Sequence, residues 1–225
     1  MKKVYGEDSL GMQKCGNGFI ILKKTDLDDR FAVTYKMISF DDNSITAVSK
    51  DKFQEAKFGK EFCSNIGSFV PNYVLCKAAK LDDKKIFVVS EDGKAKIINN
   101  KGELVREGSC SYKGGAPADI LVTGNAMWAS FPESNAIIRF NTRTMREELK
   151  IGGKGQEIIN RPRGLWFNEI RNSILVCNEG TQNIIEISLD DFTAEEYSFI
   201  GEPIYQYIKV GAFEIVWTAS GIYRL

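Results

Sequence analysis

Acidic and amide side chains follow three apolar segments of this sequence, at the point where each segment ends. The set comprises Glu91, Asp92, Glu133, Asn178 and Glu179. Carboxylate and amide oxygens are the ligands that Ca²⁺ and Mg²⁺ prefer in proteins. If the three segments are equivalent strands around one axis, these oxygens converge, and the set predicts a divalent metal site. The alternative is that polar residues follow the strands because turns are solvated.

A second set of candidate residues is basic. Lys154 lies in the glycine-rich segment 152–156, and Arg161 and Arg163 follow shortly after it. Backbone amides of such a segment can cradle an anion, so these three cations predict a binding site for an acidic ligand. The segment lacks the ending and the following helix of a Walker loop, and a flexible connection is the alternative.

Aromatic side chains close to expected loop ends form a third set, which consists of Tyr112, Phe131, Tyr205 and Tyr207. Exposed aromatic rings stack on sugars and peptides and are frequent at the energetic centres of interfaces. This set therefore predicts a stacking surface for a ligand.

The composition removes several function classes. The 225 residues contain no histidine, which excludes Ser-His-Asp and Cys-His catalysis and every histidine metal site. The 30 basic and 30 acidic residues balance, so no overall field attracts nucleic acid or an anionic membrane. No apolar run has the length of a membrane span, and the N-terminus does not resemble a secretory signal. Five widely spaced cysteines fit reduced thiols, from which we expect a cytoplasmic protein.

The elements that must position these residues follow one pattern that is repeated five times. Its centre is a short apolar segment, found at 19–22, 86–89, 127–130, 174–177 and 214–217. We expect an inner strand before each centre, at 12–15, 73–79, 119–123, 164–167 and 204–210. A third strand is expected at 35–40, 94–99, 135–140, 182–187 and 221–225, and an outer strand at 54–59, 103–108, 147–152 and 194–201. Repeats of this size are typical of radial arrays.

The repeat predicts an all-β fold, a single β-propeller of five four-stranded blades. The last repeat lacks an outer strand, and the segment 2–7 can supply it, so the N-terminal strand is expected to pair with the C-terminal blade and close the ring. The expected blades are 9–68, 69–114, 115–159, 160–200, and 201–225 together with 1–8. The first blade is long, which leaves a sixth blade as the alternative, and no helix is expected anywhere.

The segment 119–189 resembles the NHL and YVTN types of propeller repeat. The motifs that carry the resemblance are Ala-Pro-Ala-Asp-Ile at 116–120, Ser-Asn-Ala-Ile-Ile-Arg-Phe at 134–140, and their counterparts at 161–165 and 182–187. The resemblance implies a propeller that is a binding scaffold, a lactonase or a lyase. Lyases of the streptogramin and amidating types and paraoxonases rely on histidines, whereas lactonases of the gluconolactonase type hold their metal with Glu, Asn and Asp.

From these observations we expect a non-catalytic scaffold that binds a protein or a small ligand at the loop face of the ring. The loop face is the side that carries the connections from middle to third strands and from each outer strand to the next blade. No cofactor is expected for a scaffold. The first alternative is a hydrolase or lyase that depends on Ca²⁺ or Mg²⁺, and the second is a lectin.

Overall fold

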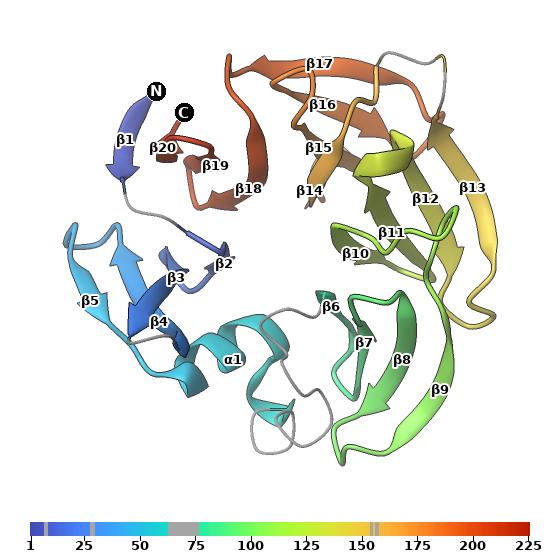
Figure 1. Ribbon diagram of the computed structural model, residues 1–225, viewed down its shortest axis with the longest axis horizontal. Helices are drawn as coiled ribbons and strands as arrows, with labels where there is room; N and C mark the ends of the chain where they lie inside the picture. The colour runs from blue at the N-terminus through green and yellow to red at the C-terminus, as the bar shows by residue number, and fades with distance from the viewer. Residues whose placement is uncertain (7–8, 28–29, 63–76, 154, 156–157) are drawn as a thin grey trace.

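Five four-stranded antiparallel sheets stand as blades around one axis in the computed structural model of this protein (Figure 1). The structure describes residues 1–6, 9–27, 30–62, 77–153, 155 and 158–225, and for 24–27 and 30–32 it describes the backbone alone. Within these residues the predicted β-propeller with five blades is confirmed, and a sixth blade is not formed.

Each blade is an antiparallel meander, and its four strands follow one another in order from the axis to the rim. Blade 1 contains β2 (Gly11–Lys14), β3 (Gly18–Leu27), β4 (Arg30–Ser39) and β5 (Ile45–Ala47). Blade 2 contains β6 (Lys77–Asp82), β7 (Lys85–Val89), β8 (Lys94–Asn99) and β9 (Leu104–Ser109). Blade 3 contains β10 (Asp119–Thr123), β11 (Ala126–Phe131), β12 (Ala136–Asn141) and β13 (Glu147–Gly152). Blade 4 contains β14 (Pro162–Asn168), β15 (Ser173–Asn178), β16 (Asn183–Ser188) and β17 (Ala194–Phe199).

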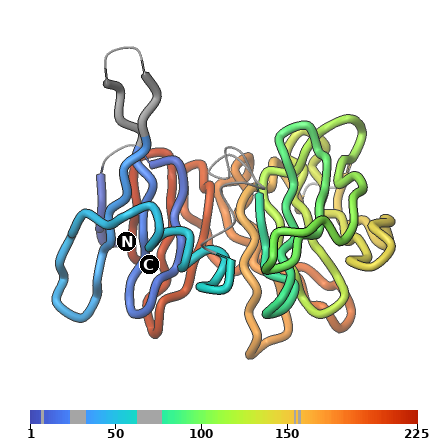
Figure 2. Tube along the Cα trace, turned by 90° about the horizontal axis from the view of Figure 1, so that it is seen from below, coloured from blue at the N-terminus to red at the C-terminus, as the bar shows by residue number. Residues whose placement is uncertain are grey.

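Blade 5 joins the two ends of the chain. It contains β18 (Ile204–Val210), β19 (Phe213–Thr218), β20 (Gly221–Arg224) and the N-terminal strand β1 (Lys2–Tyr5). β1 pairs antiparallel with β20, with Lys2 opposite Arg224 and Tyr5 opposite Ile222. The two ends of the chain therefore lie side by side, in the ribbon view of Figure 1 and in the Cα trace of Figure 2. The predicted closure of the ring by the N-terminal strand is confirmed.

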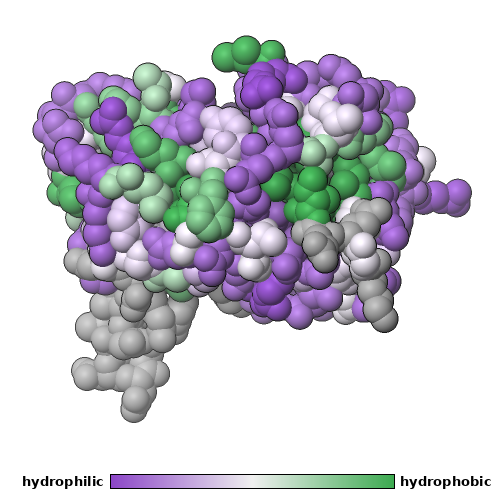
Figure 3. Space-filling model, turned by 90° about the horizontal axis from the view of Figure 1, so that it is seen from above, coloured by the Kyte–Doolittle hydropathy of each residue, from purple (hydrophilic) through white to green (hydrophobic). Residues whose placement is uncertain are grey.

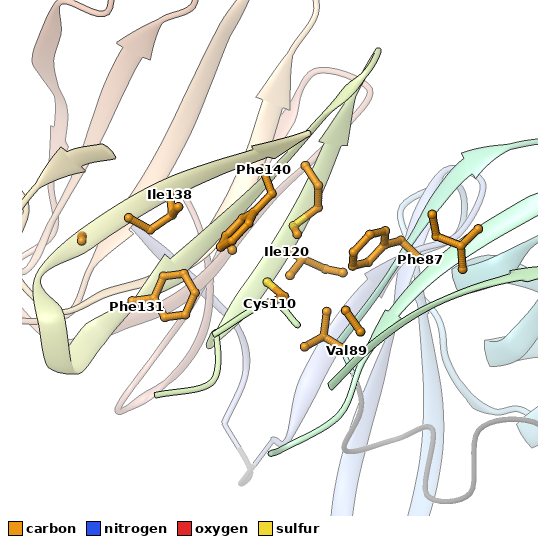
Figure 4. Close-up of a cluster of buried hydrophobic side chains, with 12 residues drawn as sticks. Phe87, Val89, Cys110, Ile120, Phe131, Ile138 and Phe140 are labelled. Atoms are coloured by element: carbon orange, nitrogen blue, oxygen red, sulfur yellow. The ribbon is translucent and has the colours of Figure 1, made fainter. Parts of the chain in front are cut away.

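The hydrophobic core consists of five clusters, one at each junction between neighbouring blades. In the cluster between blades 2 and 3, Phe87 and Val89 of β7 face Ile120 of β10 (Figure 4). A middle strand is buried on both of its faces because a blade covers each side, as the six buried residues of β11 show. That double burial explains the continuous apolar runs at the centre of each repeat.

A helix lies where the sequence predicted the outer strand 54–59, so that prediction and the expectation of no helix were wrong. α1 (Lys50–Phe58) begins at Ser49, whose side-chain oxygen accepts a hydrogen bond from the Lys52 amide at 3.2 Å, and ends at Gly59 with φ of 88°. Both are standard helix termini. A short 3₁₀ turn, η1 (Lys60–Phe62), follows, and a second, η2 (Pro132–Ser134), follows β11. The outer strand of blade 1 is β5 instead.

α1 acts as a wedge between blades 1 and 2. It contacts the inner strands β2 and β6, whereas the other neighbouring inner strands contact each other directly. Its buried Phe53 and Phe58, with Phe62 of η1, pack against apolar side chains of both blades. No helix in the described part of the chain has the length and apolar character needed to cross a bilayer.

β3 extends to Leu27 and β4 begins at Arg30, so both strands are longer than the segments 19–22 and 35–40 that the repeat predicts. Their register runs from Gly18 opposite Ser39 to Leu27 opposite Arg30. The long first repeat is therefore explained by an extended hairpin and by α1.

Blades 4 and 5 approach each other closely at Gly164. A Cβ atom on Gly164 would lie 2.8 Å from both the Gln206 Cα and the Tyr205 carbonyl oxygen, which are backbone atoms that cannot move aside. We expect Gly164→Ala to lower the free energy of unfolding by roughly 1–3 kcal/mol in urea denaturation. Gly11→Ala in β2 is the matched control, because nothing lies within 4 Å of its Cβ position. Equal stability of the two variants would contradict the close approach.

Candidate functional site

Two hairpin ends of blades 3 and 4 bring four charged residues together on the loop face. β11 ends at Phe131, η2 follows, and Asn135 closes that turn in the left-handed conformation with φ of 49°. On blade 4, Pro162 of β14 pairs with Asn178 of β15. That register places the residues flanking Pro162 beside the residue after Asn178.

The backbone of Arg161 is held in a strained conformation by polar contacts. Its φ is 51°, which side-chain-bearing residues adopt at a cost of about 1 kcal/mol. The Arg161 amide donates to the Asn135 Oδ1 at 2.9 Å, and the Arg161 carbonyl accepts from the Glu179 amide at 3.1 Å. The buried Asn178 donates from its Nδ2 to the Ile158 carbonyl at 2.8 Å and so holds the same connection. The position of Arg161 is therefore set by both neighbouring blades.

The four charged side chains form what we call the ion-pair cluster: Glu133, Arg161, Arg163 and Glu179. The Glu179 Oε2 lies 2.8 Å from the Arg163 Nε and 3.3 Å from the Arg161 Nε. Glu133 reaches the Arg161 Nη1 at 3.5 Å. The Glu179 side chain is 18% exposed, Arg161 is 43% exposed and Glu133 is 79% exposed, so the cluster has a protected carboxylate inside and a solvated one outside.

A layer of polar contacts beneath the cluster fixes the main chain at Arg163. The Ser130 hydroxyl donates to the Arg163 carbonyl, and the Asp119 Oδ2 accepts from the Leu165 amide at 2.9 Å. Burial raises the pKa of the Asp119 carboxyl. The charge of the nearby Lys77 and the hydrogen bonds from the Leu165 and Ile120 amides oppose that effect. Asp119 and Ser130 thus tie blade 3 to blade 4 directly under the two arginines.

Charge pairing controls the protonation of Glu179. Burial alone would raise the pKa of its carboxyl, but the hydrogen bond and charge of Arg163, with the charge of Arg161, outweigh burial and lower the pKa from its usual 4.5. A carboxyl with a lowered folded-state pKa stabilises the protein above its unfolded-state pKa, and this contribution is lost as the pH falls through the lowered value.

We therefore expect Glu179→Gln to lower the free energy of unfolding by about 1 kcal/mol at pH 7, because two arginines lose their inner partner. The difference from the unsubstituted protein should shrink as the pH falls below 4.5 and Glu179 itself becomes protonated. Urea denaturation at pH 7 and pH 3 measures both values. Glu133→Gln, at the exposed end of the cluster, should change stability little at either pH, and a pH-independent effect of Glu179→Gln would contradict the charge pairing.

Tyr112 packs against Phe131, at the end of the strand that leads to Glu133 of the ion-pair cluster. Its ring centroid is 5.8 Å from that of Phe131, which is buried in the core, and the Lys113 Nζ lies 5.5 Å from the Tyr112 ring centroid. Phe131 continues directly into Pro132 and Glu133. Phe131 therefore supports Tyr112 from below and is not itself a stacking surface.

Tyr205 lies near the start of β18 in blade 5, next to the inner strand of blade 4. Its carbonyl lies at the Gly164 position, next to Arg163, and its ring packs edge-on against Trp217 at 5.1 Å between centroids. Tyr207, by contrast, is buried between blades 4 and 5. Tyr112, the ion-pair cluster and Tyr205 lie at strand ends and connections on the loop face of blades 2 to 5, and we call this set the loop-face band.

The residues of the expected metal set do not share one site. Glu133 and Glu179 pair with arginines, Asn178 holds a loop, and Asp92 bonds to Ser90 and lies 2.9 Å from the Lys94 Nζ. The Ser90 hydroxyl and then Lys94 lower the pKa of Asp92. Glu91 is exposed beside it in the turn after β7. Within the described residues no group of three or more Cys, Asp or Glu side chains is placed to hold a metal ion.

Lys154 lies outside the described residues. From the sequence, the arginines and the glutamates were predicted to belong to two separate sites. In the structure they form one ion-pair cluster. The sequence could have revealed the joint site. An inner strand pairs antiparallel with the middle strand of its blade, so residues at the start of the inner strand lie beside residues that follow the middle strand.

The architecture has counterparts among solved structures. A protein of unknown function from Bacteroides thetaiotaomicron has a TM-score of 0.62 with 14% identity, over 99% of this chain and 69% of that one. The WD40 β-propeller domain of Doa1 has a TM-score of 0.57 with 12% identity, over 96% and 62%. A catalytically inactive histidine-to-alanine variant of virginiamycin B lyase from Staphylococcus aureus, with quinupristin, has a TM-score of 0.53 with 13% identity, over 99% and 84%.

These likenesses place the chain among the β-propellers and define the fold alone, because all three identities are low. The chain spans about half the length of U3-55K and of the RRP9 WD40 repeats, which it also matches. Neither a protein-family model nor a curated protein matches this sequence.

Proposed function

We propose that this protein is a non-catalytic recognition scaffold that binds acidic side chains of a protein partner at the loop-face band. The strained, doubly anchored backbone of Arg161 carries this proposal. Strained backbone persists only where surrounding contacts impose it, and such positions concentrate at binding sites. Here the strain presents a guanidinium at the surface of the ring.

The exposed end of the ion-pair cluster suits an incoming carboxylate. Glu133 is the most solvated member and makes the longest pair, at 3.5 Å. Exposed pairs of this kind contribute little stability, so a partner's carboxylate can replace Glu133 at Arg161 at small cost. Glu179 meanwhile keeps both guanidinium groups oriented through their Nε atoms. An arginine held in this way can bind a carboxylate through two parallel hydrogen bonds.

The flanking aromatic rings favour a protein as the partner. Tyrosine and arginine are the residues most enriched at the energetic centres of protein interfaces. Tyr112 and Tyr205 lie on either side of the cluster, and both rings are supported by a second ring. A rigid aromatic ring next to a fixed cation loses little conformational entropy on binding.

No observation on the described residues favours the other candidates. The metal site expected for a hydrolase includes Glu179 among its five candidate ligands, but Glu179 pairs with two arginines. The lyase neighbour is inactive when a histidine is replaced, and this chain contains no histidine. Within the propellers we propose an NHL or YVTN type of repeat from the motifs in 116–140 and 161–187. The unpaired Cys15, Cys110 and Cys177 support a cytoplasmic location.

The test uses fluorescein-labelled peptides that contain four glutamates around a tyrosine, with the four glutamates replaced by lysines as the reference peptide. Fluorescence anisotropy at 50 mM and 300 mM salt should show binding of the acidic peptide that weakens with salt. Arg161→Asn, which tolerates the left-handed backbone, should weaken binding at least tenfold.

Arg143→Asn in the β12–β13 turn is the matched control, because it removes one exposed arginine from the opposite face. It should leave the affinity unchanged, and both variants should melt like the unsubstituted protein. Equal binding of the acidic and basic peptides, or equal effects of the two substitutions, would overturn the proposal.

A further inference from the structure

Eight residues with a side chain adopt the left-handed backbone conformation in the described part of the chain. Outside glycine this conformation is costly, and asparagine tolerates it better than most residues. Three of the eight are asparagines, and the other five are Lys113, Met145, Arg161, Gln182 and Phe192. Each of these five therefore calls for a structural or functional reason.

Local contacts account for three of the five. Met145 packs its side chain against the core cluster between blades 2 and 3, and the Phe192 ring centroid lies 6.3 Å from that of Trp128 in blade 3. The Gln182 carbonyl accepts hydrogen bonds from two amides that follow β17, at 2.9 and 3.2 Å. The remaining two residues are both cations, and both lie in connections between blades on the loop face.

Lys113 occupies the tip of a miniature hairpin. Tyr112 and Gly115 exchange two backbone hydrogen bonds of 3.0 Å, and Lys113 and Gly114 between them have φ of 50° and 80°. Two-residue turns with positive φ at both central positions prefer asparagine followed by glycine. Lysine at the first position departs from that preference.

The contacts of the Lys113 side chain do not explain this departure. The side chain is exposed, and its Nζ lies 5.5 Å from the Tyr112 ring centroid. An exposed cation–π contact is weak and is no larger than the cost of the left-handed backbone. Among the described residues Lys113 forms no ion pair, so its ammonium group is available to a carboxylate of a partner.

The two cations flank the turn η2 of blade 3. The connection that carries Lys113 precedes blade 3, and the connection that carries Arg161 follows it. Tyr112, next to Lys113, packs against Phe131, which directly precedes η2. On the other side, the Arg161 Nη1 lies 3.5 Å from Glu133 within η2. The loop face of blade 3 is thus bordered by a positive charge on each side.

The surface of the ring favours recognition through charge. On the side of the ring that carries β17 and β1, hydrophilic residues predominate and hydrophobic residues form smaller areas between them (Figure 3). Large apolar patches are typical of interfaces that form mainly through burial. A mainly hydrophilic surface instead suits a partner that is selected by the positions of its charges.

We propose that Lys113 and Arg161 form a two-point clamp, in which each cation binds a different carboxylate of one acidic segment that lies across blade 3. The clamp rests on the proposed function, because it uses the same loop face and the same Arg161. It adds that the partner carries two acidic side chains that are apart in its sequence. Backbone that is fixed at both cations lowers the entropy lost on binding. A residue choice that disfavours the local turn is expected where presentation of a side chain matters more than stability.

The probe is a fluorescein-labelled peptide with two glutamates separated by a flexible spacer of glycine and serine. Two companion peptides each carry glutamine in place of one of the glutamates. In fluorescence anisotropy, Lys113→Asn should weaken the two-glutamate peptide by about threefold or more, as one of the two glutamine replacements does. With that glutamine peptide Lys113→Asn should have no further effect, whereas Arg161→Asn should still weaken binding, because only the second contact remains.

Lys101→Asn in the β8–β9 turn is the matched control, since the same substitution removes one exposed lysine from the opposite face. It should leave the affinity for every peptide unchanged. Lys113→Arg keeps the charge and should keep the affinity for the two-glutamate peptide. Lys113→Asn should melt at or above the temperature of the unsubstituted protein, because asparagine before glycine suits this turn. Lost binding then cannot come from unfolding.

The outcomes separate the clamp from the proposed function. If Arg161→Asn weakens binding and Lys113→Asn does not, the clamp is overturned and the proposed function stands. Equal weakening of all three peptides by Lys113→Asn also overturns the clamp, because Lys113 then acts only through the overall charge. If the two-glutamate peptide does not bind, or if neither substitution changes its affinity, both the clamp and the proposed function are overturned.

Discussion

Removing residues 1–6 should lower the melting temperature by roughly 10–20 °C. The deletion takes away β1, whose Tyr5 is buried among side chains of blades 1 and 5, and leaves β20 as an unpaired edge. Burial of one large side chain contributes about 1.5–3 kcal/mol, and each lost backbone hydrogen bond about 0.5–1.5 kcal/mol. Together, the lost burial of Tyr5 and the several lost hydrogen bonds between β1 and β20 amount to roughly 4–6 kcal/mol, which is a large part of the stability of an ordinary domain. Calorimetry measures the shift, and light scattering measures aggregation through the new edge.

Lys2→Ala is the control for that deletion, because Lys2 is exposed and its substitution leaves the backbone pairing with β20 intact. It should melt within a few degrees of the unsubstituted protein. If the truncated protein melts within the same few degrees, the pairing of β1 with β20 does not hold the ring together.

Phe58→Ala should be the most damaging single substitution outside the blades. Phe58 is buried between α1 and the two blades that the helix separates, with Ile86 and Val88 of β7 on one side. Truncating a buried phenylalanine costs about 3–5 kcal/mol through lost burial and the cavity left behind. For a chain of this size that corresponds to a fall in melting temperature on the order of 10 °C. Urea denaturation gives the free energy directly.

Lys60→Ala tests whether the effect comes from the wedge itself. Lys60 lies two residues further along, is largely exposed and makes, among the described residues, a long ion pair of 3.6 Å with Glu55. We expect a change below about 0.5 kcal/mol. If Phe58→Ala lowered the free energy of unfolding as little as Lys60→Ala, the segment 50–62 would contribute little packing and the blades would close without it.

The strands of this fold could be predicted because double burial leaves a direct trace in the sequence. A run such as Ile174 to Cys177 has no polar side because blades cover both of its faces, and β15 lies where that run predicts it. The hairpin turns between the runs define the register within each blade. The closing strand could be predicted because one outer strand was missing at one end and one unassigned segment remained at the other.

The helix was missed although its local signals are present. Ser49 and Gly59 are standard helix boundaries, and lysine, glutamine, glutamate and alanine between them favour a helix. The pattern of the repeat demanded an outer strand at that place, and the segment 54–59 was interpreted as that strand. That aromatic side chains of a helix fill the space between blades 1 and 2 becomes visible only in the three-dimensional structure.

The candidate site could be predicted in its residues but not in its chemistry. Arg161, Arg163, Glu133 and Glu179 were all singled out, since polar residues at equivalent strand ends gather on one face. Their pairing depends on distances of 2.8 to 3.5 Å that follow from the relative position of two blades. The left-handed backbone of Arg161 leaves no mark in the sequence, because the residue that imposes it, Asn135, belongs to the preceding blade.

The pairing of β1 with β20 also has a consequence for biosynthesis. β1 finds its partner β20 only after blades 1 to 4 and the rest of blade 5 have been translated, about 10–45 s later at the usual rates of translation. Throughout that time Tyr5 has no cover from blade 5, and the four earlier blades stand as an open arc. Apolar side chains at the junction of blades 1 and 5 therefore stay exposed to water until β20 has been made and the arc can close.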